Sequence, residues 1–256
     1  MTEAKLYDLT AEPFTLADTF TRLFPLSPEE REQLQRLAAR TEQVEPRRKL
    51  ITEARPSHML FILTAGWLFE SKQLRNGGRQ IVNFRLPGDI VGIEGLAFKD
   101  ALHSTTTLTH CTVAPLPVAS FEQTQREFPR LASALFLMTL RDGAIRHEWE
   151  VNIGRRTALS RTAHLFAELD RRIRERGLAF DGSIPMPLTQ EEIADCTGLT
   201  PPYVNRMLQT MRVKGLIRFE NKTLEILDRI ELAKIAGFDP AYIEGWGHGS
   251  SSFGST

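Results

Sequence analysis

Cysteine is scarce in this sequence: Cys111 and Cys196 are the only two among 256 residues, and no CxxC spacing occurs. Two distant thiols do not make a zinc or iron–sulfur framework, and their small number indicates a reducing compartment. We therefore predict no metal site and no cofactor.

Long hydrophobic runs and an excess of charge are also absent. The longest strongly apolar runs, such as Met59 to Leu63, are too short to span a bilayer, and Met1 to Phe14 lacks a signal-peptide pattern. With 32 basic and 32 acidic residues the net charge is zero, which argues against indiscriminate polyanion binding. A chain 41% hydrophobic and 25% charged has a globular composition, with room for two domains. We expect a cytoplasmic protein with no membrane partner.

The segment from Thr189 to Leu227 has the pattern of a winged helix-turn-helix. Thr189 and Glu192 form a capping box that opens a first helix. Gly198 supplies the left-handed backbone that a tight turn between helices requires, and Thr200 then caps a second helix. A plain helical hairpin is the alternative, but capping, turn, basic surface and wing together favour DNA binding.

The second helix carries most of the predicted DNA contacts. The segment from Pro201 to Gly215 contains Arg206, Arg212 and Lys214 and no acidic residue, as a helix facing phosphates and base edges requires. Beyond it, alternating residues on both sides of an Asn221-Lys222 turn predict a hairpin, the wing. The predicted DNA-binding residues are Thr189, Gln190, Thr200, Pro202, Tyr203, Asn205, Arg206, Gln209, Arg212, Lys214 and Lys222.

The N-terminal half is predicted to consist of short strands. Met59 to Gln73 and Arg79 to Phe84 alternate on either side of an Asn76-Gly77-Gly78 turn, and Thr105 to Leu108 and Cys111 to Ala114 continue the pattern. Short strands at regular intervals predict an antiparallel β-barrel or jelly roll that encloses a pocket. The fold class is therefore α+β.

A long helix is predicted from about Phe128 onward. Its apolar stripe is expected to pair with a second copy of the chain in a twofold dimer, the alternative being an intramolecular spacer helix. The next helix, capped by Thr157, ends in Arg171 to Arg176, which we interpret as a solvated surface. The predicted dimer residues, near heptad spacing, are Leu135, Met138, Ile145, Trp149 and Asn152.

These elements predict four segments. Residues 1–127 form a sensory β-roll, 128–156 a dimerisation helix, and 157–237 the winged helix-turn-helix. Residues 238–256 form a disordered tail, rich in Gly and Ser from Gly245 onward.

The order of these parts, together with four sequence strings, resembles the Crp/Fnr family of bacterial transcription regulators. The strings are NGGRQI at 76–81, LPGDIVG at 86–92, FPRL at 128–131 and the segment 188–206, and the resemblance covers residues 20–237. It implies a homodimer, without catalytic activity, that binds double-stranded DNA at an inverted-repeat operator and contacts RNA polymerase. A cyclic-nucleotide-binding-like β-roll would then bias that binding.

The resemblance also implies roles within the second helix. The family usually has a glutamate where Pro202 stands and an arginine that Arg206 matches. A bidentate contact from Arg206 to guanine, worth about 1 to 3 kcal/mol of base discrimination, is therefore predicted, with a phosphate contact as the alternative. The missing glutamate implies a different half-site, with Tyr203 and Asn205 as replacement contacts.

Two effectors of the family are not expected here. Glu94 stands one residue from the usual ribose-binding glutamate, and His103-Ser104 stands where the cyclic-nucleotide branch has Arg-Ser, so cAMP would lack its bidentate phosphate partner. No cysteine precedes Cys111, whereas the oxygen-sensing branch holds its iron–sulfur cluster with N-terminal cysteines. The candidate effector pocket comprises Gly92, Glu94, His103 and Ser104.

Three other interpretations stay open. The β-roll could bind nothing, so that abundance alone controls the regulator. A cupin-like metal-dependent barrel enzyme would use His58, His103, His110 and Glu94, although the sequence has no HxH pair. Oxidation of Cys196 beside the helix-helix turn is a further hypothesis for control of DNA binding.

Overall fold

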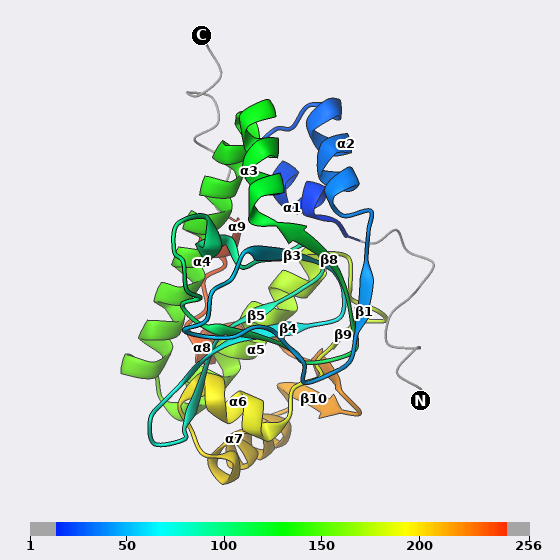
Figure 1. Cartoon of the computed structure of the whole chain (residues 1–256). Coiled ribbons are helices and arrows are strands. Elements are labelled where there is room, and N and C mark those ends of the chain that lie inside the picture. Colours follow the sequence, from blue (N-terminus) through cyan, green and yellow to red (C-terminus); the bar gives the residue numbers. More distant parts are fainter. Residues whose placement is uncertain (1–13, 245–256) are drawn as a thin grey trace. The chain divides into compact units, whose positions relative to one another are not determined.

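A computed structural model describes residues 14–244 of the chain (Figure 1). These residues divide into two compact units, 14–143 and 144–244. The division falls inside one helix, α4 (Arg130–Arg155). The segment predicted as a separate dimerisation helix, residues 128–156, is therefore shared between the two units.

Two antiparallel four-stranded sheets make up most of the N-terminal unit. Their strand orders are β1-β8-β3-β6 and β2-β7-β4-β5. Neither sheet closes on itself, so the fold is a jelly roll and not a closed barrel. The strands are β1 (Glu42–Val44), β2 (Lys49–Ile51), β3 (Met59–Ala65), β4 (Leu68–Gln73), β5 (Arg79–Arg85), β6 (Ile90–Val91), β7 (Ser104–Thr107) and β8 (Cys111–Pro117), with a short 3-10 helix, η2 (Ile93–Leu96).

Glycines set two of the turns in this unit. Gly66, between β3 and β4, has φ +88°, and a Cβ there would lie 2.3 Å from the carbonyl oxygen of His110. Gly77, in the predicted turn between β4 and β5, has φ +87°. Both positions favour glycine because other residues are strained at positive φ. The long predicted strand 59–73 is consequently two strands.

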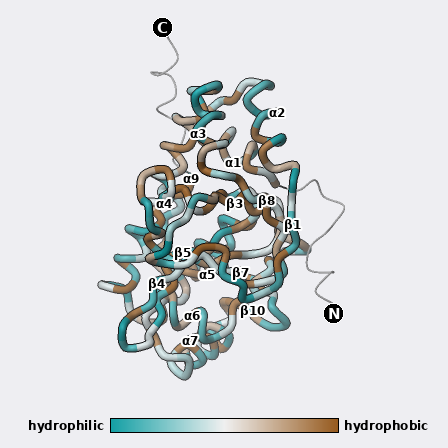
Figure 2. The backbone as a smooth tube through the Cα atoms, viewed as in Figure 1, coloured by the Kyte–Doolittle hydropathy of each residue, from teal (hydrophilic) through white to brown (hydrophobic). Residues whose placement is uncertain are grey.

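Four helices accompany the sheets, and two of them start with capping boxes. Thr15 with Asp18 opens α1 (Leu16–Leu23), and Ser27 with Glu30 opens α2 (Pro28–Leu37). The helix α3 (Val118–Glu127) precedes α4. The core joins all four to β3, whose apolar run is visible in Figure 2, and includes Leu16, Leu34, Leu60, Ile62, Phe121, Leu131, Ala134, Leu135 and Met138.

The C-terminal unit contains the predicted winged helix-turn-helix. Its three-stranded sheet has the order β10-β11-β9, and α5 contacts α6, α7 and α8. The predicted caps Thr157 and Asp228 accept backbone hydrogen bonds at the starts of α5 and α8. The elements are α5 (Ala158–Glu175), β9 (Ser183–Pro185), α6 (Gln190–Thr197), α7 (Pro201–Val213), β10 (Ile217–Glu220), β11 (Thr223–Ile226), α8 (Arg229–Ala236) and α9 (Ala241–Glu244).

The predicted tail begins later than residue 238. The hydroxyl of Tyr242 donates to the buried carboxylate of Glu168 over 2.9 Å, and Ile243 is 1% exposed. Residues 238–244 thus belong to the C-terminal unit, because Tyr242 and Ile243 pack within it. Residues 245–256, for which disorder was predicted, lie outside the described part of the chain.

The sequence suggested that the arginines at the end of α5 form a solvated surface, but most of them are paired within the unit. Arg172 is 2% exposed and pairs with Glu168 at 3.2 Å, and Arg176 is 7% exposed and donates to the Arg172 carbonyl oxygen. Arg171 is paired with Glu244 of α9. The arginine side chains of this segment therefore mostly bind acceptors of the same unit, since buried cations require partners.

Candidate nucleic-acid interface

The helix-turn-helix is formed by α6, a turn at Gly198 and α7. Thr189 and Glu192 make the predicted capping box, with the Thr189 N–H donating to the Glu192 carboxylate over 2.6 Å. Gly198 has φ +65°, and its N–H bonds the carbonyl oxygen of Ala194. Thr200 occupies the N-cap of α7, but its side chain makes no capping hydrogen bond. The hydroxyl of Thr200 is thus not used in the cap.

The residues predicted to contact DNA lie on the outside of this unit. All are exposed except Gln190 and Asn205, which are half-buried and joined by a 3.3 Å hydrogen bond from the Asn205 amide to the Gln190 oxygen. Val204, Leu208 and Met211 form the buried side of α7. The helix therefore presents its polar side chains outward, as the spacing predicted.

Arg206 has an arrangement that the sequence did not reveal. Its guanidinium lies over the ring of Tyr203, 4.5 Å from the ring centroid. Within the described residues its side chain has no hydrogen bond or ion pair. An arginine held on an aromatic ring keeps its donors available to a ligand.

Arg212 and the wing are joined by a contact that sequence reasoning missed. Nη2 of Arg212 donates to the carbonyl oxygen of Phe219 on β10 over 2.7 Å. The turn between β10 and β11 has positive φ at both Asn221 (+51°) and Lys222 (+59°), the geometry of a tight two-residue hairpin. Lys222 thus lies at the tip of the wing.

Arg161 of α5 is a second residue that the sequence did not single out. Its guanidinium donates to the carbonyl oxygens of Thr197 (2.6 Å), Ile153 (3.0 Å) and Arg156 (3.2 Å). It therefore joins the last turn of α4 to the end of α6, where free carbonyl groups favour a cation. No sequence pattern marks this role, because the three acceptors are backbone atoms.

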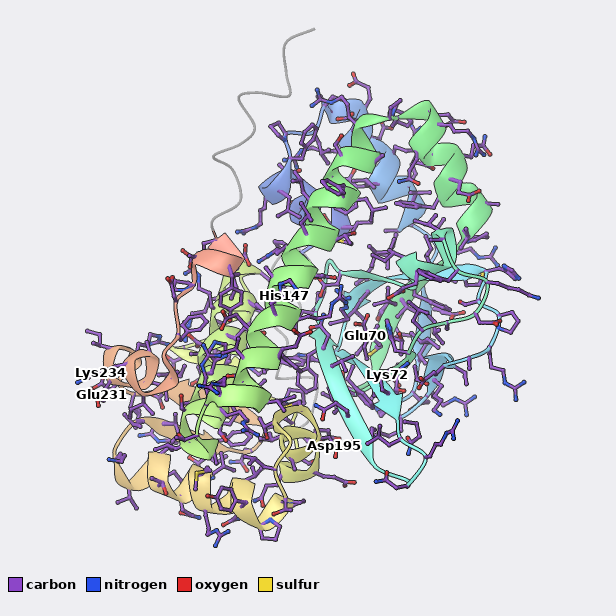
Figure 3. The ribbon with its side chains drawn as sticks, turned by 90° about the vertical axis from the view of Figure 1, so that its left-hand side faces the viewer. Glu70, Lys72, His147, Asp195, Glu231 and Lys234 are labelled. Carbon is purple, nitrogen blue, oxygen red and sulfur yellow. The ribbon has the colours of Figure 1, made fainter. Side chains whose placement is uncertain are left out.

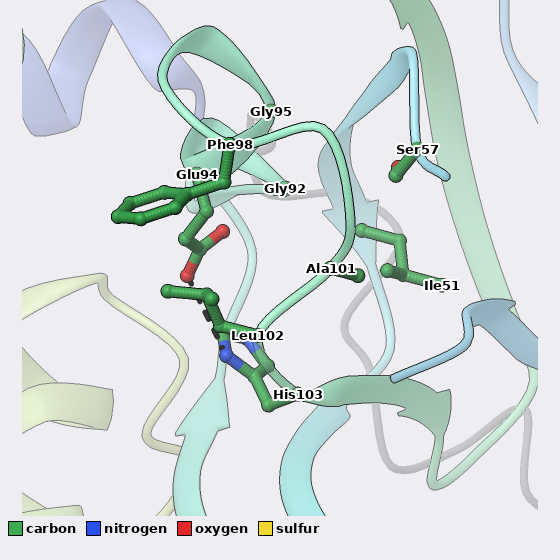
Figure 4. A pocket seen from close by; sticks show the side chains of 9 residues that line it. All are labelled: Ile51, Ser57, Gly92, Glu94, Gly95, Phe98, Ala101, Leu102 and His103. Carbon is green, nitrogen blue, oxygen red and sulfur yellow. Dashed lines mark ion pairs between the residues drawn. The ribbon is translucent and has the colours of Figure 1, made fainter. Parts of the chain in front are cut away.

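The predicted effector residues only partly come together. Gly92, Glu94 and His103 line one small pocket, with Phe98 and Leu102 beside them (Figure 4). The hydroxyl of Ser104 instead accepts the N–H of Glu53 over 3.1 Å. The cavity measures only about 10 Å³, roughly the room for one water.

A chain of charged side chains, buried at Glu70 and Arg85 and half-buried at His103 and Glu94, closes this pocket. His103 lies 3.5 Å from the carboxylate of Glu94 (Figure 4) and 3.4 Å from that of Glu70 on β4, which is labelled in Figure 3. Arg85 donates to both Glu70 oxygens, over 2.8 and 3.1 Å, and to the carboxylate of Asp142 on α4. The protein's own side chains thus fill the predicted effector pocket.

These contacts shift the proton equilibria of the buried groups. Burial alone would raise the pKa of Glu70, but Arg85 and His103 hold that pKa far below its usual value. Burial alone would lower the pKa of His103, yet Glu70 and Glu94 raise it. Glu70 is therefore ionised throughout the neutral range.

A cyclic nucleotide does not fit this position. At the position where the cyclic-nucleotide branch has its phosphate-binding arginine, His103 is engaged by Glu70 and Glu94, and the guanidinium of this cluster, Arg85, is 3% exposed and engaged by two carboxylates. A bound phosphate would be left without a bidentate partner. The residues present thus disagree with a cyclic-nucleotide site.

Both cysteines are buried, and neither forms a disulfide bond. The Cys196 thiol donates to the Ile193 carbonyl oxygen over 3.3 Å, and burial raises its pKa well above the usual value. Across residues 14–244, no group of three or more His, Cys, Asp or Glu side chains is arranged to hold a metal ion. None of the helices in the same range combines the length and apolarity needed to cross a membrane.

The stripe predicted for dimerisation faces the interior of the chain. All five residues are at most 8% exposed. Leu135 and Met138 pack in the core of the N-terminal unit, the Trp149 indole donates to Glu168 over 3.1 Å, and Asn152 lies 3.0 Å from a ring nitrogen of His164. These five side chains thus pack within the chain, and the exposed Phe136, Leu140 and Val151 lie on the other side of α4.

Comparisons with known proteins agree with this architecture. A family model described as a Crp-like helix-turn-helix domain matches residues 160–235, and one described as a cyclic nucleotide-binding domain matches residues 41–127. The transcriptional activator protein FnrL of Cereibacter sphaeroides is 33% identical over 180 residues, which are 66% of this chain and 69% of that protein. The transcriptional activator protein anr of Pseudomonas aeruginosa is 27% identical over 188 residues, covering 73% and 77% of the two chains.

A solved structure supports the fold. FixK2 from Bradyrhizobium japonicum superimposes with a TM-score of 0.72 at 24% identity, covering 78% of this chain and 98% of that one.

Proposed function

Because this chain belongs to the Crp/Fnr family and is a DNA-binding transcription regulator with a cyclic-nucleotide-binding-like domain, we propose that it acts as a homodimer in the cytoplasm. The α7 helices of the two copies enter successive major grooves of an inverted-repeat operator. From there the dimer contacts RNA polymerase. The observation that carries this proposal is Arg206, a cation without an ion pair on an outward-facing helix.

The exposed stripe of α4 supplies the dimer contact in this proposal. Phe136, Leu140, His147 and Val151 follow one another at intervals of four, seven and four, so they share one side of the helix. Phe136 is 62% exposed, Leu140 44% and Val151 43%. Large exposed apolar side chains in one row mark an interaction surface.

Gly143 also indicates that this side of α4 is the dimer contact. Gly143 lies on this stripe, and a Cβ added there would meet no atom within 4 Å. A glycine in a helix interior costs about 1 kcal/mol relative to alanine, so an open position calls for another reason to keep it small. Close approach of a second helix provides that reason.

Sedimentation of the double variant Phe136→Glu/Leu140→Glu tests the dimer. We expect a monomer at concentrations where the unchanged protein is dimeric, because four carboxylates would face one another across the twofold axis. Leu74→Glu, which alters an exposed apolar residue near the β4–β5 turn, is the matched control and should stay dimeric. A dimeric double variant would remove this side of α4 from the proposal.

Base reading by Arg206 is the second part of the proposal. The guanidinium is stacked on Tyr203, so its orientation is restricted before DNA arrives, and less freedom is lost on binding. A bidentate contact with guanine then discriminates by about 1 to 3 kcal/mol at one base pair of each half-site. Arg212, tied to the wing, is expected to contact phosphate instead.

Selection of duplexes from a random pool tests base reading and needs no known operator. The unchanged protein should enrich an inverted repeat. Arg206→Ala should lose preference at one position per half-site, whereas Arg212→Ala should weaken all sequences alike. Tyr203→Phe should behave like the unchanged protein and Tyr203→Ala should resemble Arg206→Ala in part. Uniform weakening by Arg206→Ala would assign Arg206 to phosphate.

A further inference from the structure

A larger cavity lies within the N-terminal unit, away from the closed pocket around His103. It measures about 210 Å³ and is bounded by α1, α2 and β3. Its apolar wall includes Leu16, Ala17, Leu34 and Ile62. The cavity is partly open to solvent and its wall is mostly apolar, so covering that wall with an apolar ligand would be favourable.

Two of the three polar side chains in the wall are already used by the protein. The Thr15 hydroxyl donates to Asp18 over 2.7 Å, and the Thr64 hydroxyl donates to the carbonyl oxygen of Thr112 over 3.0 Å. Gln35 is the one exposed polar side chain in the wall whose amide has no hydrogen-bonding partner within the described residues. The cavity therefore offers neither a charge nor a set of free donors, which excludes a nucleotide or an ion as its occupant.

We propose that this cavity is a binding site for a small uncharged apolar molecule that acts as the effector of the regulator. An apolar cavity of about 150 Å³ takes up benzene, so the larger volume here suits a molecule with one or two fused aromatic rings or a short branched alkyl chain. One polar substituent can reach the Gln35 amide at the edge. The effector role rests on the proposed function, whereas binding itself does not.

The wall of the cavity is part of the core that holds α4. Leu16, Leu34 and Ile62 belong to the same apolar cluster as Leu135 and Met138. The outward side of this half of α4 carries Phe136 and Leu140, the proposed dimer contact. Filling the cavity changes how α1 and α2 pack on that cluster, and this connects occupancy to the dimer helix.

Titration of the full-length protein with indole and naphthalene tests the site. We expect saturable binding of one molecule per chain, with the methyl resonances of Ile62 and Leu34 shifting in step with occupancy. Ala38→Phe places a ring in the cavity and should weaken binding at least tenfold. Ala39→Phe changes the next residue, which is exposed and does not line the cavity, and should leave binding unchanged within twofold.

The outcomes separate binding from regulation. Absence of saturable binding by both probes overturns the site. Binding that leaves the Ile62 and Leu34 methyl resonances in place also overturns it, and this holds even if Ala38→Phe fails to fold. Affinity for a selected duplex should change at least threefold when naphthalene saturates the unchanged protein, and not in folded Ala38→Phe. Binding without that change overturns the effector role alone, and failure of the unchanged protein to select any duplex concerns the proposed function instead.

Discussion

Replacing Arg85 by methionine should strongly destabilise the N-terminal unit. Among residues 14–244, the Arg85 guanidinium joins the carboxylates of Glu70 and Asp142, and the side chains of these two residues are 1% and 9% exposed. Removing one partner of a buried ion pair costs about 3 to 5 kcal/mol, because the remaining charges stay in an environment of low polarity. We expect a loss of that size in the free energy of unfolding at pH 7.

The contribution of Glu70 to the pH dependence of the free energy of unfolding should change sign in Arg85→Met. In the unchanged protein the depressed pKa of Glu70 adds stability above the unfolded pKa, and that stability is lost as the pH falls. Without Arg85, burial raises the pKa of Glu70, so the folded state takes up a proton and is more stable at low pH. Each pH unit over which one extra proton is bound contributes about 1.4 kcal/mol. The deficit of Arg85→Met should therefore be smaller at pH 5 than at pH 7.

Urea unfolding followed by circular dichroism at both pH values measures these differences. Arg75→Met, at an exposed position near the β4–β5 turn, should lie within about 0.5 kcal/mol of the unchanged protein. A loss below about 1 kcal/mol for Arg85→Met, or a deficit that does not depend on pH, would refute the assignment of a buried ionised network.

Three further substitutions have defined outcomes. Tyr242→Phe removes the hydroxyl that donates to buried Glu168 and should lower the free energy of unfolding of the C-terminal unit by about 1 to 3 kcal/mol in urea; a loss within error means that another donor serves Glu168 equally well. Gly198→Ala places a Cβ at φ +65° and should cost about 1 kcal/mol in the same assay while weakening duplex binding, so unchanged values would show that the turn relaxes. Cys196→Ser should leave the response of duplex binding to peroxide unchanged, because the buried thiol is protonated; a lost response would revive the redox hypothesis.

Local signals in the sequence predicted much of the fold. Capping boxes such as Thr189 with Glu192 and the left-handed turn at Gly198 depend on neighbouring residues alone. The alternating strands of the jelly roll and the wing were found for the same reason. The order of these elements then sufficed for the family, whereas the contacts of α7 with DNA stay a prediction.

Which side of a helix is buried was not predictable in the same way. The spacing of Leu135 and Trp149 indicates a stripe, but periodicity does not tell whether a second copy or the chain's own core covers it. Arg172 was misjudged because its partner Glu168 and the cover from the rest of the unit are tertiary features. The cavity beside α1 and the closing of the effector pocket by His103 likewise depend on distances between segments far apart in sequence.

The three carbonyl oxygens bound by Arg161 have a consequence for the operators that the proposed dimer would accept. One guanidinium joins the last turn of α4 to the end of α6. The helix-turn-helix is therefore expected to move together with the end of α4. Inserting one base pair between half-sites rotates one of them by roughly 34° about the duplex axis, for a repeat of about 10.5 base pairs per turn. If this connection is rigid, the proposed dimer would bind such a duplex through one subunit at a time, and the length of the spacer between half-sites would contribute to its specificity.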